Sequence, residues 1–457
     1  MFETIKNCFK VKEIRKKIWI TLLLLFIFRL GSYIPVPGIN PEQFGEAISD
    51  NSFLNIMSSI TGGSLANATL FALGISPYIN ASIIIQLLTV GIPALERLSK
   101  QGEEGRKKIA KITRFVTIIL AVAQAIGIIV NFGVQGDALR LSVFGFVPGG
   151  ISETAAQWVA GIFLTVVYTG GAMLVMWIGE RITEYGISNG ISLIIFVGII
   201  STAGLTILNK FLGIFGVGDF AEGGITNIWE ILGFVLLTVV EFVAIVTVDL
   251  SERKIPVQYA KQVKGRKMYG GQSSVIPIRI AGSGVMPLIF AFALISFPQM
   301  IISLFWPNSA ANTNITIWFS GQGAWYGQLI YMIVLCLLIF AFAFFYSSMQ
   351  FNPEDVSKTI QQNGGFIQGF RPGKPTAEYL KKINNRITLF GAIYLSLVAF
   401  IPSILSMVLS ATLPNMDLSL LSVFSTTGIL IVVSVALELD KQLQSQLMMK
   451  NYKGFLK

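Results

Sequence analysis

Long stretches without a charged residue constrain this chain more than any other feature. Apolar runs bounded by charged residues occupy 51–95, 115–136, 154–179, 185–209, 280–353, 387–415 and 417–437. About 20 uncharged apolar residues in a helix cross the hydrocarbon core of a bilayer. Only 13% of the 457 residues are charged, about half the share in a soluble chain. The sequence therefore predicts an integral membrane protein.

These runs predict ten membrane spans. The run 280–353 is long enough for two spans, divided near 307–323. Two further spans each carry one interior charge, 18–37 with Arg29 and 228–248 with Glu241. An even number of spans predicts that both termini lie on the same side of the membrane.

The Lys and Arg residues orient the chain. Of the 34 Lys and Arg residues, 31 lie in six places: the N-terminal segment, the stretch 97–114, position 181, the stretches 253–279 and 358–386, and the C-terminal tail. The three exceptions are Arg29, Arg140 and Lys210. Positive charge is enriched in cytoplasmic loops. We therefore expect a multi-pass membrane protein with both termini in the cytoplasm. Its net charge of +10 suits anionic lipids or an acidic or nucleic-acid-containing partner.

Composition argues against catalysis and metal binding. The chain has no histidine, which removes His-based acid–base chemistry and His metal sites. Cys8 and Cys336 are too far apart in the predicted topology to form a disulfide or a metal site. A phosphate-binding loop of the G-x-x-x-x-G-K-[ST] type does not occur. We expect no catalytic residue, metal or cofactor, and a retained first span rather than a cleaved signal peptide.

Residues 51–95 are too long for one span and too short for two. The part from Phe53 to Thr69 is too polar to face lipid, whereas Leu70 to Ile92 is a good span. A short polar helix at membrane depth must be surrounded by protein or by a water-filled cavity. The alternative is a helix on the extracytoplasmic surface.

Two cytoplasmic loops, 249–279 and 350–386, carry local structure signals. Alternation at Ile255, Val257 and Tyr259, followed by Lys264-Gly265, predicts a projecting hairpin. Asn352-Pro353 predicts a helix start, and that helix should stop at Gly364-Gly365. A second helix, capped by Thr376, should run toward Arg386. Charged, solvated loops are the alternative for both regions.

Few polar groups lie inside the spans. The adjacent Glu180 and Arg181 are expected to neutralise each other. Asn80, Gln86 and Gln124 lie within apolar runs, where an amide needs a partner. They either bond across a fixed helix pair or pair across a helix interface that opens. The spans also divide five and five, 1–215 and 216–457, as in an inverted repeat that places a pathway between its halves.

Three stretches are distinctive: FALGISPYINASIIIQ at 71–86, GERITEYGISNGIS at 179–192 and GFRPG at 369–373. They closely resemble the SecY family, the channel subunits of the bacterial secretion translocon, and the resemblance extends over essentially the whole chain. It implies an all-α membrane protein in which ten transmembrane helices, in two inverted five-helix halves, form a clamshell around a central pore. The polar segment 53–67 is then the plug that fills the idle channel.

The resemblance also assigns functional residues. The pore ring corresponds to isoleucines on four spans: Ile75, Ile79, Ile191, Ile195, Ile289 and Ile431. The plug residues are Phe53, Ile56, Ile60, Gly62, Gly63 and Asn67. The lateral gate corresponds to Asn80, Ile83, Gln124 and Phe297. Arg266, Lys267 and Arg371 match the surface for the SecA motor and the ribosome; Lys267 departs from a frequent Arg-Arg pair.

The predicted function is a passive channel that passes unfolded secretory proteins and releases apolar segments sideways into the bilayer. The implied partners are SecE, SecG, the SecA ATPase, the ribosome, signal sequences with their secretory polypeptides, and membrane lipids. Two alternatives belong to other classes. A secondary transporter would need a midplane solute site, and an intramembrane enzyme, such as a lipid transferase, would need a catalytic cluster.

Overall fold

The computed structural model describes residues 2–49, 58, 61–130, 153–214, 224–259, 262–264, 267–269, 273–280, 286–306, 309, 314, 318, 325–412 and 426–454. The chain divides into two compact units. The first comprises Met1–Ile231, Ala293–Tyr331 and Val435–Lys457, and the second comprises Leu232–Phe292 and Met332–Ser434. The division into halves at residue 215 stays a prediction.

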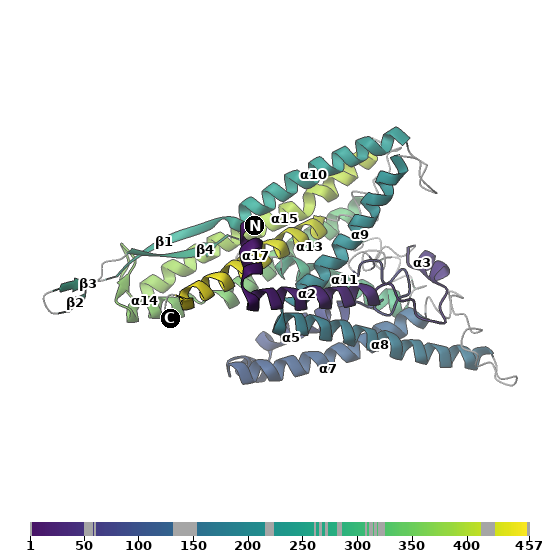
Figure 1. Cartoon of the computed structure of the whole chain (residues 1–457), viewed down its shortest axis with the longest axis horizontal. Helices are drawn as coiled ribbons and strands as arrows, with labels where there is room; N and C mark the ends of the chain where they lie inside the picture. The colour runs from purple at the N-terminus through teal and green to yellow at the C-terminus, as the bar shows by residue number, and fades with distance from the viewer. Residues whose placement is uncertain are drawn as a thin grey trace. The chain divides into compact units, whose positions relative to one another are not determined.

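Ten long helices match the ten predicted spans within the described residues (Figure 1). They are α2 (Lys12–Gly31), α5 (Ser76–Gly91), α7 (Glu103–Ile128), α8 (Glu153–Tyr185), α9 (Gly190–Ile214), α10 (Gly224–Leu250), α11 (Met286–Phe305), α13 (Trp325–Gln350), α15 (Lys374–Thr412) and α17 (Thr426–Gly454). Among the described residues, five stretches alone are long and apolar enough to cross a membrane, and a bent pair adds a sixth.

The bent pair consists of α5 and the short helix α6 (Pro93–Ser99), which meet at 104°. Ile92 between them has an extended backbone, and Pro93 occupies the first position of α6. The residue before a proline is disfavoured in the helical region, so the chain turns here. At its other end, the helix in the predicted span Leu70–Ile92 is shorter than expected, because α5 begins only at Ser76.

The predicted polar half-helix is, in its described part, a set of turns. Ser58 is helical, but residues 61–75 form turns. Gly62 and Gly63 have φ angles of 74° and 81°, values that a right-handed helix cannot contain. The turn is also buried, with Ser64 and Leu65 both 0% exposed. The alternative of a surface helix is therefore wrong for the described residues.

The first unit is held together by close helix packing. Helix α8 packs against α2, α7 and α9, and α5 packs against α7. A Cβ atom on Gly190, the first residue of α9, would collide with the carbonyl oxygen of Gly179 in α8. The Gly190 amide donates to Thr183 Oγ1 at 2.9 Å. Only glycine permits this approach, which fixes where α9 begins.

A buried cluster joins segments near the two ends of the chain within the first unit. Cys8 of α1 (Phe2–Lys10) packs with Ile14 of α2, Ile187 and Leu443 of α17. Burial, with the charge of Asp440, raises the pKa of the Cys8 thiol. Cys8 and Cys336 are both free thiols. A further short helix, α3 (Pro41–Ser49), follows α2.

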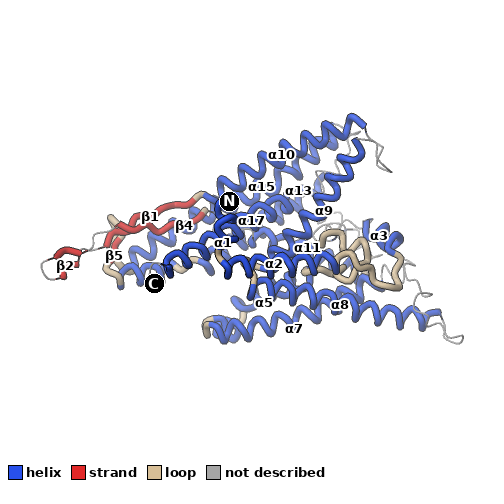
Figure 2. Tube along the Cα trace, in the orientation of Figure 1, coloured by secondary structure: helices blue, strands red, loops and turns tan. Residues whose placement is uncertain are grey.

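The second unit carries the described strands (Figure 2). Strands β1 (Glu252–Tyr259) and β4 (Ser273–Arg279) form an antiparallel ribbon, and β5 (Gly365–Phe366) pairs with the other edge of β1. In the sequence between β1 and β4, strands β2 (Gln262–Lys264) and β3 (Lys267–Tyr269) form a separate hairpin in which Lys264 lies opposite Lys267. The predicted hairpin is confirmed.

The second loop follows its sequence signals except at one helix start. Asn352 caps α14 (Pro353–Gln362) by accepting from the Glu354 amide at 3.1 Å, and the helix stops before Gly364, as predicted. The prediction for Thr376 is wrong, because α15 begins at Lys374 and runs unbroken to Thr412. The Thr376 hydroxyl instead donates back to the Arg371 carbonyl at 2.7 Å.

Candidate functional site

A sulfur atom joins three helices of the first unit at the predicted lateral gate. The Gln124 amide of α7 donates to Met300 Sδ of α11 at 3.2 Å, and the Asn80 amide of α5 donates to the same sulfur at 3.9 Å. Asn80, Gln124 and Met300 are 8%, 3% and 4% exposed. A thioether is a weak acceptor, so this junction is polar but weakly bonded.

The other two predicted gate residues, Phe297 and Ile83, are partly or fully buried. Phe297, one helical turn before Met300, packs against the same buried cluster, and Ile83 is buried. Gln86 does not contribute to the junction, because its amide donates to Ser82 of its own helix at 3.1 Å. Met300 was not predicted, because the sequence does not show that Asn80 and Gln124 face the same span.

Only one of the two polar groups of the Gln124 side chain has a hydrogen-bond partner among the described residues. Its amide nitrogen reaches Met300, whereas its carbonyl oxygen is buried and has no hydrogen-bond partner among the described residues. A buried polar atom without a partner costs about 1–3 kcal/mol. Within the described residues, the packed arrangement of α5, α7 and α11 therefore contains one buried polar atom whose desolvation is not compensated.

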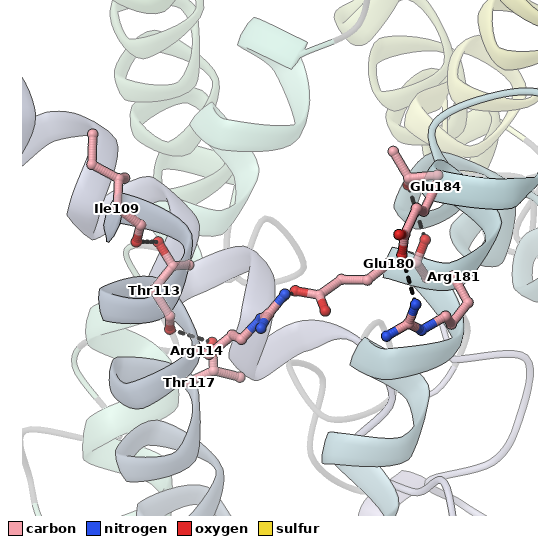
Figure 3. A network of polar contacts seen from close by, with 9 residues as sticks. Ile109, Thr113, Arg114, Thr117, Glu180, Arg181 and Glu184 are labelled. Carbon is pink, nitrogen blue, oxygen red and sulfur yellow. Dashed lines mark hydrogen bonds and ion pairs between the residues drawn. The ribbon is translucent and has the colours of Figure 1, made fainter. Parts of the chain in front are cut away.

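An ion pair also ties α7 to α8 (Figure 3). Arg114 Nε lies 2.8 Å from Glu180 Oε1, and Arg181 Nη1 lies 2.6 Å from Glu184 Oε2. The expectation that Glu180 and Arg181 neutralise each other is wrong. Successive helical residues point in different directions, and each finds a partner elsewhere.

Two of the predicted ring residues meet in the first unit. A Cβ atom on Gly179 of α8 would lie 3.6 Å from both Ile75 Cδ1 and Ile191 Cγ1, so these side chains approach the same point. Ile79 and Ile195 follow one turn later on α5 and α9, since the Ile79 amide donates to the Ile75 carbonyl. Ile289 and Ile431 lie in the second unit, on α11 and α17. Closure of a six-residue ring stays a prediction.

The described part of the predicted plug is a compact turn. Gly62, Gly63 and Asn67 lie in it, whereas Phe53, Ile56 and Ile60 lie outside the described residues. The Gly63 amide donates to the Ser58 carbonyl, and the Ser64 hydroxyl donates to the Thr61 carbonyl. These bonds give the turn its own internal structure.

The predicted docking residues lie on the second unit. Lys267 begins β3, and Arg266 lies outside the described residues. Arg371 is exposed on a braced loop: Phe370 stacks on Tyr379 with ring centroids 4.0 Å apart, and Ser357 donates to the Gly373 carbonyl at 2.7 Å. An open pocket of about 650 Å³ lies beside it, lined by Gln361, Gly364, Gly365, Phe366, Ile367, Gly369, Phe370, Arg371 and Pro372.

The chain shares its fold with solved protein-conducting channels. One such structure is of a SecY protein whose plug domain stabilises the closed state of the translocation channel. The match covers 94% of this chain and 92% of that chain, at 21% identity and a TM-score of 0.63. Sec61 in the canine ribosome–channel complex covers 94% and 92% at 20% identity and a TM-score of 0.59.

Sequence relatives give the family. The family model for SecY matches residues 69–439. The protein translocase subunit SecY of Halalkalibacterium halodurans is 38% identical over 458 residues, covering 100% of both chains. The chain belongs to the SecY family. A secondary transporter, the alternative left open by the topology, is not favoured.

Proposed function

We propose that this chain is the protein-conducting subunit of a Sec translocon in the cytoplasmic membrane, with both termini in the cytoplasm and no catalytic residue of its own. Its partners are SecE, SecG, the SecA ATPase, the ribosome, secretory polypeptides with their signal sequences, and surrounding lipids. Full-length similarity to a SecY translocase subunit supports this assignment.

The Asn80–Met300–Gln124 junction is the observation that carries the proposed gating mechanism. It joins α5 and α7 to α11 through two hydrogen bonds to one thioether sulfur. A signal sequence is itself an apolar helix and can replace these contacts with its own. It shifts the gate toward the open state only by binding that state better, and a weakly bonded junction lowers the binding energy required.

The isoleucine ring and the plug together form the proposed seal. Each unit charge that crosses the membrane is worth about 2.3 kcal/mol per 100 mV, so an idle open channel dissipates ion gradients. Branched apolar side chains make a constriction that resists wetting. They offer no hydrogen bond to a passing polypeptide, so the ring seals without selecting a sequence.

The basic loops form the proposed docking surface. Arg371 on its braced loop and Lys267 in the hairpin present cations to SecA or to ribosomal phosphates, together with Arg266, which follows from the family resemblance alone. Arg binds carboxylate or phosphate through two parallel hydrogen bonds, whereas Lys acts as a point charge. Ribosome contact is therefore expected to weaken steeply with salt.

Two substitutions at the gate have opposite expected effects. Met300→Leu removes the sulfur and leaves two buried amides without an acceptor, so the closed gate loses about 1–3 kcal/mol and weakly apolar signal sequences pass. Gln124→Leu removes both the unpaired side-chain carbonyl and the side-chain NH₂ group of Gln124, so the closed gate is stabilised. Signal sequences must then be more apolar to open it. Translocation of one client with a graded series of signal sequences measures both.

The wild-type chain and Leu87→Met, on the exposed side of α5, serve as references. Signal stringency that moves in the same direction for Met300→Leu and Gln124→Leu would exclude the sulfur junction as a gate element.

The experiment that tests the function is protease protection of a signal-bearing secretory chain. Proteoliposomes contain this protein with SecE, SecG, SecA and ATP. Protection that requires ATP supports a protein-conducting channel. If the folded and correctly oriented protein gives none, the transporter alternative returns, and a screen for uptake of small solutes follows.

A further inference from the structure

Arg29 is an unexplained charge within a predicted membrane span. It lies in the last turn of α2, and its guanidinium stacks over the Tyr33 ring with 4.3 Å between Cζ and the ring centroid. One nitrogen, Nη2, donates to the Tyr33 hydroxyl at 2.6 Å. The other, Nη1, donates to the carbonyl oxygen of Gly62 at 3.1 Å. A residue of the first span thus holds the backbone of the proposed plug.

The contact at Gly62 is tightly built. A Cβ atom there would lie 2.9 Å from Arg29 Nη1 and 3.2 Å from Gly198 Cα of α9. Its positive φ of 74° also favours glycine. Gly62 therefore fits between the guanidinium and α9, with its carbonyl turned toward Arg29.

The opposite end of the turn is attached in another way. The Val36 amide donates to the Ala68 carbonyl at 3.0 Å, and the Leu70 amide donates to the Ile34 carbonyl at 2.9 Å. These backbone bonds lie next to the start of α5. The turn between the two attachments is bonded internally, by Asn67 to Gly63 and by Thr69 to Ser64, and its Leu65 side chain packs into the buried cluster of the first unit.

We propose that Arg29 is a positioning residue that helps to retain the plug in the closed channel through the Gly62 carbonyl, and that loss of this charge-assisted bond shifts the plug toward release while the 68–70 end stays attached. This inference rests on the proposed plug function. Arg suits the role because its planar group stacks on Tyr33 and donates in two directions at once. A lysine in its place keeps the charge but loses this geometry.

The first test is a double-mutant cycle on resting ion conductance. The channel complexes are wild type, Arg29→Met, a variant lacking 53–67, and the combination, in planar bilayers. We expect Arg29→Met to raise resting conductance and to add nothing once the plug segment is deleted, because residues that act through one another are non-additive. Arg29→Lys should give an intermediate conductance. Arg140→Met controls for the loss of a positive charge on the same predicted side.

Each other outcome has a defined meaning. If deletion of 53–67 leaves conductance unchanged, the plug function is wrong and the inference falls with it. If the deletion leaks but Arg29→Met does not, the plug stands and the role of Arg29 is overturned. Equal added leaks with and without the plug segment would make Arg29 a purely structural residue, which also overturns the inference.

A second readout reports the position of the plug itself. Ser64, buried in the turn, is replaced by cysteine in a chain whose Cys8 and Cys336 are serine, and a membrane-impermeant maleimide is added from the extracytoplasmic side. Loss of a charge-assisted bond should raise the labelling rate about tenfold in Arg29→Met, with a smaller rise in Arg29→Lys. Identical rates in wild type and Arg29→Met would refute retention.

Discussion

A channel carrying Arg371→Glu is expected to assemble with its partners and to lose SecA-driven translocation. The loop around Arg371 is braced by Thr376, which bonds the Arg371 backbone carbonyl, by the stacking of Phe370 on Tyr379, and by Ser357, which bonds the Gly373 carbonyl. None of these contacts uses the guanidinium group, so reversing its charge leaves the loop intact.

Translocation is expected to be lost because the substitution weakens the binding of SecA to this loop. Removing one partner of a buried charge pair at an interface costs about 2–5 kcal/mol, and a glutamate adds repulsion toward any acidic partner group. ATP-dependent protease protection and SecA binding to proteoliposomes are the measurements. Lys374→Glu, three residues away and exposed at the start of α15, is the matched charge reversal and should retain most activity. Normal export by Arg371→Glu would remove this loop from the docking surface.

A channel carrying Ile289→Asn is expected to leak ions at rest and to accept precursors with defective signal sequences. Ile289 is only partly buried in α11, so an amide there disturbs packing little. It binds water, however, and thereby weakens an apolar constriction that excludes water. Ile289→Leu keeps the side chain apolar and should behave as wild type. Conductance and the export of a signal-defective precursor are measured together.

Export of the signal-defective precursor decides whether Ile289 belongs to the seal. An Ile289→Asn channel that rejects defective signals as strictly as wild type, with unchanged conductance, would exclude this residue from it. Ile431→Asn on α17 is the parallel variant, because the same resemblance assigns both residues.

The spans were predictable because bilayer thickness sets the length of an apolar run, and the ten predicted spans correspond to ten helices. The ribbon and α14 were predictable from local signals, alternation at Ile255 and Val257 and the cap at Asn352. The turn at Gly62-Gly63 carried a glycine signal that the predicted half-helix ignored. In these places local sequence determines local structure.

Contacts between distant elements were the part that the sequence could not supply. Met300 has an apolar side chain, and nothing in the 3.6-residue period of α11 marks its sulfur as an acceptor for Asn80 and Gln124. The partner of Glu180 is 66 positions away, at Arg114, whereas the adjacent Arg181 looked sufficient. Such pairings depend on which helix faces come together.

The unbroken course of α15 has a mechanical consequence. The helix starts at Lys374, three residues after Arg371, and continues for 39 residues, a length of about 58 Å at 1.5 Å per residue. A partner that displaced the loop at Arg371 would therefore displace the end of a helix that has no break before Pro402. A joint near Arg386, between the loop and the span, would absorb such a displacement; α15 has none there, so a displacement of its Lys374 end would be carried into the span.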